Sequence, residues 1–163
     1  PIGPLDATAA AEAIEKPIQN ENAAISSAAI ERIVEARSGY PFFLQEWSYH
    51  AWDAAAGPEI TLHDVDIIHD NVIQSLDDGF FKVRMDRLTR AETEFVAAMA
   101  GLGEGPYAIS DIANILKRKT QSLGPTRASI IHKGMIYSPE HGYLAFTVPL
   151  FSDFMRRQQN ATN

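Results

Sequence analysis

Residues 132–157 read HKGMIYSPEHGYLAFTVPLFSDFMRR. Two short runs rich in aromatic and aliphatic residues, Met135–Tyr137 and Tyr143–Val148, flank a turn sequence at Ser138–Gly142. This pattern predicts a β-hairpin. Pro149 cannot donate a hydrogen bond to a continuing strand, so we expect the hairpin to close there. A final helix then extends to Arg157.

Three helices are predicted immediately upstream of the hairpin. Thr89-Arg90-Ala91-Glu92 is a capping box, in which the Thr and Glu side chains satisfy each other's backbone N–H groups, and an apolar stripe follows it to Leu102. The next helices are predicted at Ile109–Leu116 and Gln121–His132, joined by the basic connector Lys117–Lys119. Three helices followed by a hairpin is the order of a winged helix-turn-helix.

The first half of the chain predicts a small bundle of four helices on short loops. Proline and glycine punctuate this half, and capping residues precede apolar positions at helical spacing. The predicted helices run from Ala7 to a stop near Pro17, from Ser26 or Ser27 to Gly39, from Pro41 towards Gly57, and from the capping sequence at Thr61 through Leu76.

The predicted fold is therefore mainly α, with a helical domain at residues 1–84 and a winged-helix domain at residues 85–163. Charge supports a division into two parts. Residues 1–79 hold three basic and fourteen acidic residues, a net charge of −11, whereas residues 80–163 hold eleven basic and seven acidic residues, a net charge of +4. Only the second part favours a polyanion.

Composition excludes several classes of protein. The 163 residues contain no cysteine, which excludes disulfides and thiolate sites, and no apolar run is long enough for a membrane helix. The chain begins with Pro1 rather than Met and has no signal-peptide pattern, so we expect a cytoplasmic piece of a longer protein with no membrane partner.

Two stretches carry a resemblance that covers nearly the whole chain. Residues 132–157, quoted above, resemble the winged helix that ends many AAA-type ATPases related to the replication-initiator and STAND groups. Residues 38–52, SGYPFFLQEWSYHAW, are similar to the Gly-x-Pro turn in the helical lid that precedes that winged helix. The resemblance implies an AAA-type lid bundle followed by a winged helix with one β-hairpin.

For the lid, the resemblance implies that Gly39, Tyr40 and Pro41 contact the adenine end of ATP or ADP, which an absent N-terminal ATPase core would mainly bind. The alternative is a plain turn between two helices. Phe42, Phe43, Leu44 and Trp47 are predicted to be buried core, and Tyr49 and Trp52 are predicted to serve helical packing. The chain lacks the arginine that initiator-type lids place in this helix.

No catalytic residues are predicted. The chain contains no G-x-x-x-x-G-K-[ST] loop to hold nucleotide phosphates, so by itself it should not be an enzyme, although the parent protein would be an ATPase. His63, Asp66 and Asp70 share a helix face, but an acidic solvated face is the preferred interpretation over a metal site.

For the winged helix, DNA and protein both stay open as partners. In a DNA-reading winged helix the third helix enters the major groove, so the contacts come from its start, its outer face and nearby cations. The candidate DNA-binding residues are Lys117, Arg118, Lys119, Thr120, Gln121, Ser122, Thr126, Arg127 and Lys133. Glu140 at the predicted wing tip argues against a backbone contact there.

The sequence thus predicts the C-terminal regulatory part of an AAA/STAND-like ATPase, with a lid that contacts nucleotide and a winged helix that contacts double-stranded DNA or a protein. The alternatives are a stand-alone winged-helix DNA-binding protein and a pure protein-interaction module.

Overall fold

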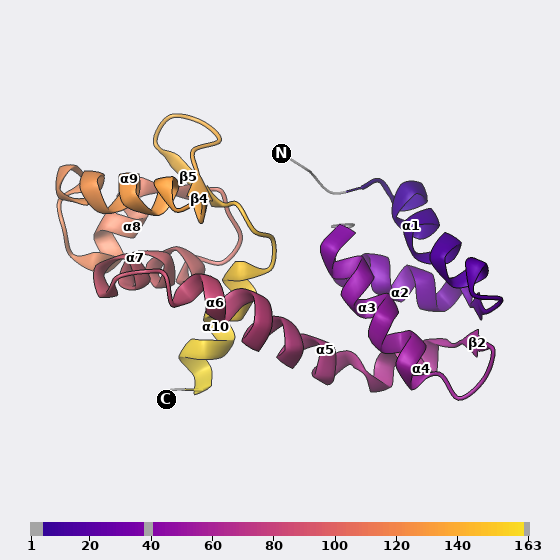
Figure 1. Cartoon of the computed structure of the whole chain (residues 1–163). Coiled ribbons are helices and arrows are strands. Elements are labelled where there is room, and N and C mark those ends of the chain that lie inside the picture. The colour runs from indigo at the N-terminus through magenta and orange to yellow at the C-terminus, as the bar shows by residue number, and fades with distance from the viewer. Residues whose placement is uncertain (1–4, 38–40, 162–163) are drawn as a thin grey trace. The chain divides into compact units, whose positions relative to one another are not determined.

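The computed structural model describes residues 5–37 and 41–161, and within these ranges the chain is mainly α-helical with small sheets (Figure 1), which confirms the predicted class. The chain divides into two compact units, Pro1–Leu76 and Asp77–Asn163, called here the first unit and the second unit. The sequence predicted the division eight residues later, between residues 84 and 85.

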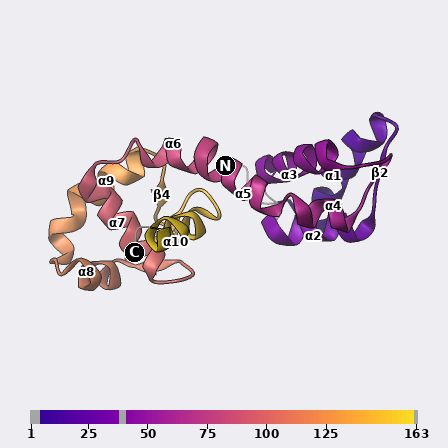
Figure 2. The same ribbon diagram turned by 90° about the horizontal axis from the view of Figure 1, so that it is seen from below.

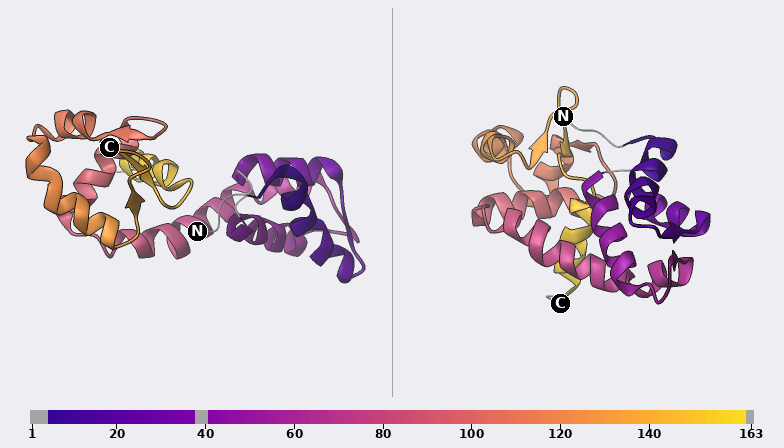
Figure 3. Two further views of the ribbon diagram at one scale, coloured as in Figure 1. Left: turned by 90° about the horizontal axis from the view of Figure 1, so that it is seen from above. Right: turned by 45° about the vertical axis from the view of Figure 1, so that its right-hand side comes forward.

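The helices of the first unit pack against one another around an aliphatic and aromatic core (Figure 3). They are α1 (Ala7–Asn20), α2 (Ser27–Arg37), α3 (Pro41–Ala54), α4 (Leu62–Ile67) and α5 (His69–Leu76). The predicted capping box at Thr61 is present, with the Asp64 carboxylate bonded to the Thr61 N–H. The helix predicted from Thr61 to Leu76 breaks only at Ile68, whose N–H still bonds to the Asp64 carbonyl.

The predicted stop of the first helix near Pro17 is wrong, because α1 continues through Pro17 to Asn20. Proline removes one helical hydrogen bond, which is costly in a helix interior. Ile14 and Ile18 lie one turn apart on the same face, and both are buried. Ile18 is buried only if the helix continues past Pro17, and this burial offsets the lost hydrogen bond.

A short parallel pair of strands was not predicted. Strand β1 (Ala24–Ile25) pairs with β2 (Glu59–Ile60), and Ile25 and Ile60 are opposite each other and buried. Each strand has two residues, which is too short for the alternation that identifies strands in a sequence. The pair fixes the loops at one end of α1 and α3.

The second unit begins with a π-helical turn (Asp77–Phe81) and the short helix α6 (Lys82–Met85). Its other helices are α7 (Arg90–Gly101), α8 (Ile109–Leu116), α9 (Gly124–His132) and α10 (Phe151–Ala161), with a 3₁₀ turn at Thr120–Leu123. Helix α7 packs against α8, α9 and α10 (Figure 2).

The predicted hairpin is confirmed. Strands β4 (Ile136–Tyr137) and β5 (Tyr143–Phe146) are antiparallel, with Ile136 opposite Phe146. A third strand, β3 (Tyr107–Ala108), was not predicted, and it pairs with the other side of β5 to give the order β3-β5-β4. Its two residues directly precede α8, so the sheet connects the start of α8 to the hairpin.

The third predicted helix starts later than expected. Residues Thr120–Leu123 form the 3₁₀ turn, and α9 begins at Gly124 with Pro125 in its first turn. Proline suits that position because the first-turn N–H groups have no helical partner. The predicted start at Gln121 would have placed Pro125 one turn into the helix, where its ring would clash with the carbonyl four residues earlier.

An aromatic cluster forms the core beneath the hairpin. The rings of Phe81 and Phe154 stack at a centroid distance of 5.2 Å, and Phe151 lies 5.6 Å from Phe154. Each of these three side chains is almost completely buried. They tie the π-helical turn to α10 within the second unit, and the ion pair from Arg157 to Asp77 joins the same two elements.

No helix among the described residues has the length and apolar character needed to span a membrane.

Candidate nucleic-acid interface

The basic connector is held in a defined shape by the end of α8. Lys117 adopts the left-handed conformation, with φ of 52°. The Arg118 N–H then bonds to the Ala113 carbonyl, and the Lys117 N–H bonds to the Asn114 carbonyl. This is a Schellman arrangement, which satisfies the last carbonyls of the helix. It turns the chain sharply, so that three consecutive cationic side chains follow a rigid helix end.

A hollow of about 290 Å³ lies next to this connector. Thr120 and Gln121 of the 3₁₀ turn line it together with Arg127 of α9 and His141 of the β4–β5 turn. A hydrogen bond of 2.9 Å from the Ile109 N–H to the Gly142 carbonyl holds that turn against the start of α8. The structure therefore brings three predicted DNA-binding residues together and adds His141, which sequence reasoning left out.

Four cations at this corner have no partner among the described residues. Lys117, Arg118 and Lys119 are exposed and make no ion pair, and Arg127 is half-buried with its Nε enclosed and without a hydrogen bond. Arg156 and Arg157 of the same unit differ, since Arg157 pairs with Asp77 and Arg156 pairs with Asp153. The corner is thus a concentration of positive charge that forms no ion pair with an acidic side chain in residues 5–37 and 41–161.

Of the remaining predicted residues, Ser122 is exposed, and its hydroxyl donates to the Lys119 carbonyl at 2.7 Å. It closes the 3₁₀ turn, so Ser122 does not cap α9, which has no side-chain cap. Thr126 is half-buried. Both residues lie on the segment that follows the connector, close in the chain to the unpaired cations.

Lys133 is tied to the protein. Its Nζ donates to Glu92 Oε2 at 2.6 Å and to the Arg87 carbonyl at 2.9 Å. Ser129 donates to the other Glu92 oxygen, and the Thr89 N–H completes the shell of the carboxylate. The capping box predicted at Thr89–Glu92 is therefore confirmed, and its glutamate also anchors α9 to α7.

Burial of the Glu92 carboxylate acts to raise its pKa, but hydrogen bonds from Lys133, Ser129 and Thr89 outweigh burial and lower the pKa from 4.5 to about 2. A carboxyl group whose pKa is lower in the folded state stabilises that state above its unfolded pKa, and the contribution is lost as the pH falls towards the folded pKa.

We therefore expect the second unit to lose stability between pH 4.5 and 2, by an amount approaching about 3 kcal/mol from this group. Both tryptophans lie in the first unit, so amide hydrogen exchange of α7 is the suitable measurement. A Glu92→Gln variant is the control. The variant should have a lower free energy of unfolding than the wild type, and this difference should shrink as the pH falls. A difference that does not change with pH would contradict the assignment.

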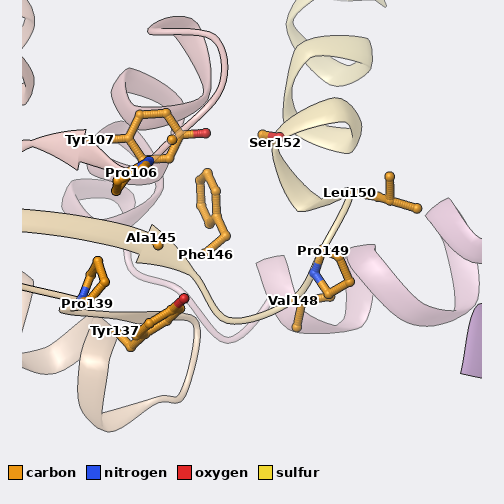
Figure 4. A pocket seen from close by; sticks show the side chains of 11 residues that line it. Pro106, Tyr107, Tyr137, Pro139, Ala145, Phe146, Val148, Pro149, Leu150 and Ser152 are labelled. Atoms are coloured by element: carbon orange, nitrogen blue, oxygen red, sulfur yellow. The ribbon is translucent and has the colours of Figure 1, made fainter. Parts of the chain in front are cut away.

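A second hollow of about 320 Å³ is lined by residues of the hairpin, of the segment 105–107 and of the start of α10 (Figure 4). Tyr107, Tyr137 and Phe146 contribute its rings, with Pro139 and Pro149 at its edge. The Tyr107 hydroxyl donates to the Gly103 carbonyl at 2.9 Å, and its pKa is raised mainly by burial. This face is aromatic rather than cationic, so it favours an apolar partner.

The predicted nucleotide-contacting residues are described only in part. Pro41 is half-buried and starts α3, whereas Gly39 and Tyr40 lie outside the described residues. In the same helix Phe43, Leu44 and Trp47 are buried, as predicted. The prediction for Phe42 is wrong, because its side chain is 46% exposed. Phe43, Trp47 and Ala51 define the buried face, and Phe42 is turned away from it.

Tyr49 and Trp52 also differ from the prediction. They were expected to serve helical packing, but Tyr49 is 68% and Trp52 is 41% exposed.

Among the described residues, no three His, Asp or Glu side chains come together in a way that could hold a metal ion.

Residues 78–155 match a protein-family model described as a domain of unknown function, DUF8462. The match lies within the second unit. No curated protein matches the chain.

Solved structures of Thermotoga maritima RuvB are similar to the chain. One is titled a Holliday junction branch migration motor, with 14% identity and a TM-score of 0.43. A RuvB mutant of the same organism has 15% identity and a TM-score of 0.46. Each match covers 88% of this chain and 47% of the RuvB chain. The chain thus spans about half the length of these structures, and its function has to be argued from its own residues.

Proposed function

We propose that the second unit is a winged helix that binds double-stranded DNA through the corner between α8 and α9. The observation that carries the proposal is the set of cations at that corner, Lys117, Arg118, Lys119 and Arg127, which have no partner among the described residues. Phosphate oxygens are the anions that such a cluster binds most readily, and release of condensed counterions from DNA drives the association.

The order of elements supports this assignment. Helices α7, α8 and α9 are followed by the hairpin β4–β5, and α9 with the turn before it corresponds to the element that a winged helix places in the major groove. Gln121, Ser122 and Thr126 carry hydrogen-bonding groups near its start. His141 would approach the backbone from the wing, where Glu140 disfavours a closer approach of the tip. Lys133 is left out of the proposed set because Glu92 holds its ammonium group.

We further propose that the chain is the C-terminal part of an AAA/STAND-like ATPase. In this proposal the first unit is the lid, and Pro41 with Gly39 and Tyr40 contacts the adenine of ATP or ADP held by an N-terminal core. The chain itself would carry out no hydrolysis. A structure of the longer protein with ADP bound, in which the purine lies away from Pro41, would contradict this part of the proposal.

A second candidate is protein docking by the second unit. The aromatic hollow formed by Tyr107, Tyr137 and Phe146 favours it, because Tyr137 is 49% exposed beside this hollow and exposed tyrosines are enriched among the residues that dominate binding at protein interfaces. The two candidates differ in how they depend on salt.

The test is binding of the chain to a labelled 20-base-pair duplex over a series of salt concentrations. If each of the four cations contacts one phosphate, the logarithm of the association constant should fall against the logarithm of salt with a slope of about −3.6. The chain has a net charge of −7, so binding would require a local basic surface. Absence of duplex binding at low salt would remove the DNA proposal and leave protein docking.

A further inference from the structure

A groove in the first unit lies between α1 and α3. Its main hollow is about 410 Å³ and is lined by Ile14, Pro17 and Ile18 from α1 and by Tyr49 and Trp52 from α3. A second hollow of about 210 Å³ continues it towards β2. The two hollows share Glu21 and Trp52, so they form one groove along about two turns of α1.

The walls of the groove are apolar and carry hydrogen-bond acceptors. Tyr49 and Trp52 are large aromatic side chains exposed to solvent, and aromatic residues of this kind dominate binding energy at protein interfaces. Pro17 has no N–H, so it cannot donate the hydrogen bond that the Ala13 carbonyl of the groove wall would otherwise accept. Ser48 also lines the groove, but its hydroxyl already donates to the Leu44 carbonyl at 2.7 Å.

The charge around the groove is negative. Residues 1–76 contain twelve acidic and three basic residues. Lys16 is paired with Glu12 and Arg32 is paired with Asp66, so neither cation offsets the remaining acidic groups. Glu21 lines both hollows, and its carboxylate makes no ion pair among the described residues. A cationic partner is therefore favoured over an anionic or neutral one.

We propose that this groove binds a basic amphipathic helix of another protein. A third helix fits between two packed helices when apolar side chains at spacings of three and four residues enter the groove. Such side chains would pack on Tyr49 and Trp52, and flanking Lys or Arg residues would reach Glu21 and the Ala13 carbonyl. The proposal does not depend on DNA binding by the second unit.

The test uses the whole chain and a fluorescein-labelled synthetic peptide of 18 residues. The peptide has Leu at helical spacing on one face and Lys on its flanks. A scrambled peptide of identical composition controls for simple charge attraction. We expect the amphipathic peptide to bind with a Kd in the range of about 1–100 μM, and the scrambled peptide to bind at least about tenfold more weakly.

Two variants locate the site, and each has a matched control in the same unit. Trp52→Ala and Glu21→Lys should each weaken binding by about tenfold or more, since an anchor or a complementary charge is lost. Ile67→Ala and Glu31→Lys make the same kinds of change at exposed positions outside both hollows, and should leave the Kd within about twofold. Circular dichroism checks that each variant is folded, and Glu21→Lys remains informative if Trp52→Ala does not fold.

Four results would overturn the proposal: equal binding of the scrambled peptide, equal loss in the control variants, unchanged binding in the groove variants, or no binding up to about 1 mM. A further measurement is sedimentation of the free chain. If the wild type is a dimer and Trp52→Ala is a monomer, a second copy of this chain covers the groove, and the proposed partner is wrong.

Discussion

Replacing Glu92 with alanine should lower the unfolding free energy of the second unit by about 3 kcal/mol. Glu92 is 4% exposed, and its carboxylate accepts hydrogen bonds from Lys133, Ser129 and the Thr89 backbone. Its removal leaves the Lys133 ammonium without its counterion, leaves the Ser129 hydroxyl without its acceptor, and opens the cap of α7. This expected loss is at the lower end of the range for breaking a buried ion pair, because the Lys133 side chain is 25% exposed and can regain some hydration.

Glu94→Ala is the matched control for this variant. Glu94 lies on the same helix and forms an exposed ion pair with Arg90, which should contribute no more than about 0.5 kcal/mol. Native-state hydrogen exchange of amides in α7 and α9 measures both variants. If the free energies of unfolding of Glu92→Ala and Glu94→Ala differ by less than about 1 kcal/mol, the buried network does not anchor α9 as described.

Replacing Arg118 and Lys119 together with glutamine should weaken binding to double-stranded DNA by up to about 60-fold at 0.1 M salt. This estimate assumes that each side chain contacts one phosphate, and that each contact contributes about 0.9 to the salt slope. Both side chains are exposed and unpaired among the described residues, so the fold should not change. Fluorescence anisotropy with a short labelled duplex measures the affinity.

Lys82→Gln with Arg90→Gln is the control for the DNA-binding variant. It removes the same charge from two exposed residues of the second unit that lie outside the α8–α9 corner. Binding should fall by no more than about threefold, because only the long-range field changes. An equal loss in the two double variants would mean that DNA responds to net charge and does not contact this corner.

Local signals in the sequence were sufficient for much of the second unit. The Thr89–Glu92 capping box, the helix at Ile109–Leu116 and the β4–β5 hairpin each depend on residues close together in the chain, and each is present. Pairings of two residues, such as β3 with β5, carry too little pattern to be predicted. The late start of α9 follows from Pro125, which lies in the first turn of the helix.

Long-range contacts explain why parts of the candidate interface were not predictable. Lys133 was grouped with the DNA-binding cations, but its partner Glu92 is 41 residues away in the chain. His141 joins Thr120 and Arg127 only because the β4–β5 turn folds against the start of α8. In the first unit, the buried face of α3 is set by α1 and α2, which leaves Phe42, Tyr49 and Trp52 exposed.

The most direct test of the proposed DNA contact is the salt dependence of duplex binding for the wild type and the Arg118→Gln/Lys119→Gln variant, measured side by side. We expect two straight lines of log association constant against log salt, with the variant's slope less steep by about 1.8. Parallel lines, or wild-type binding that does not change with salt, would contradict the assignment of the α8–α9 corner to DNA.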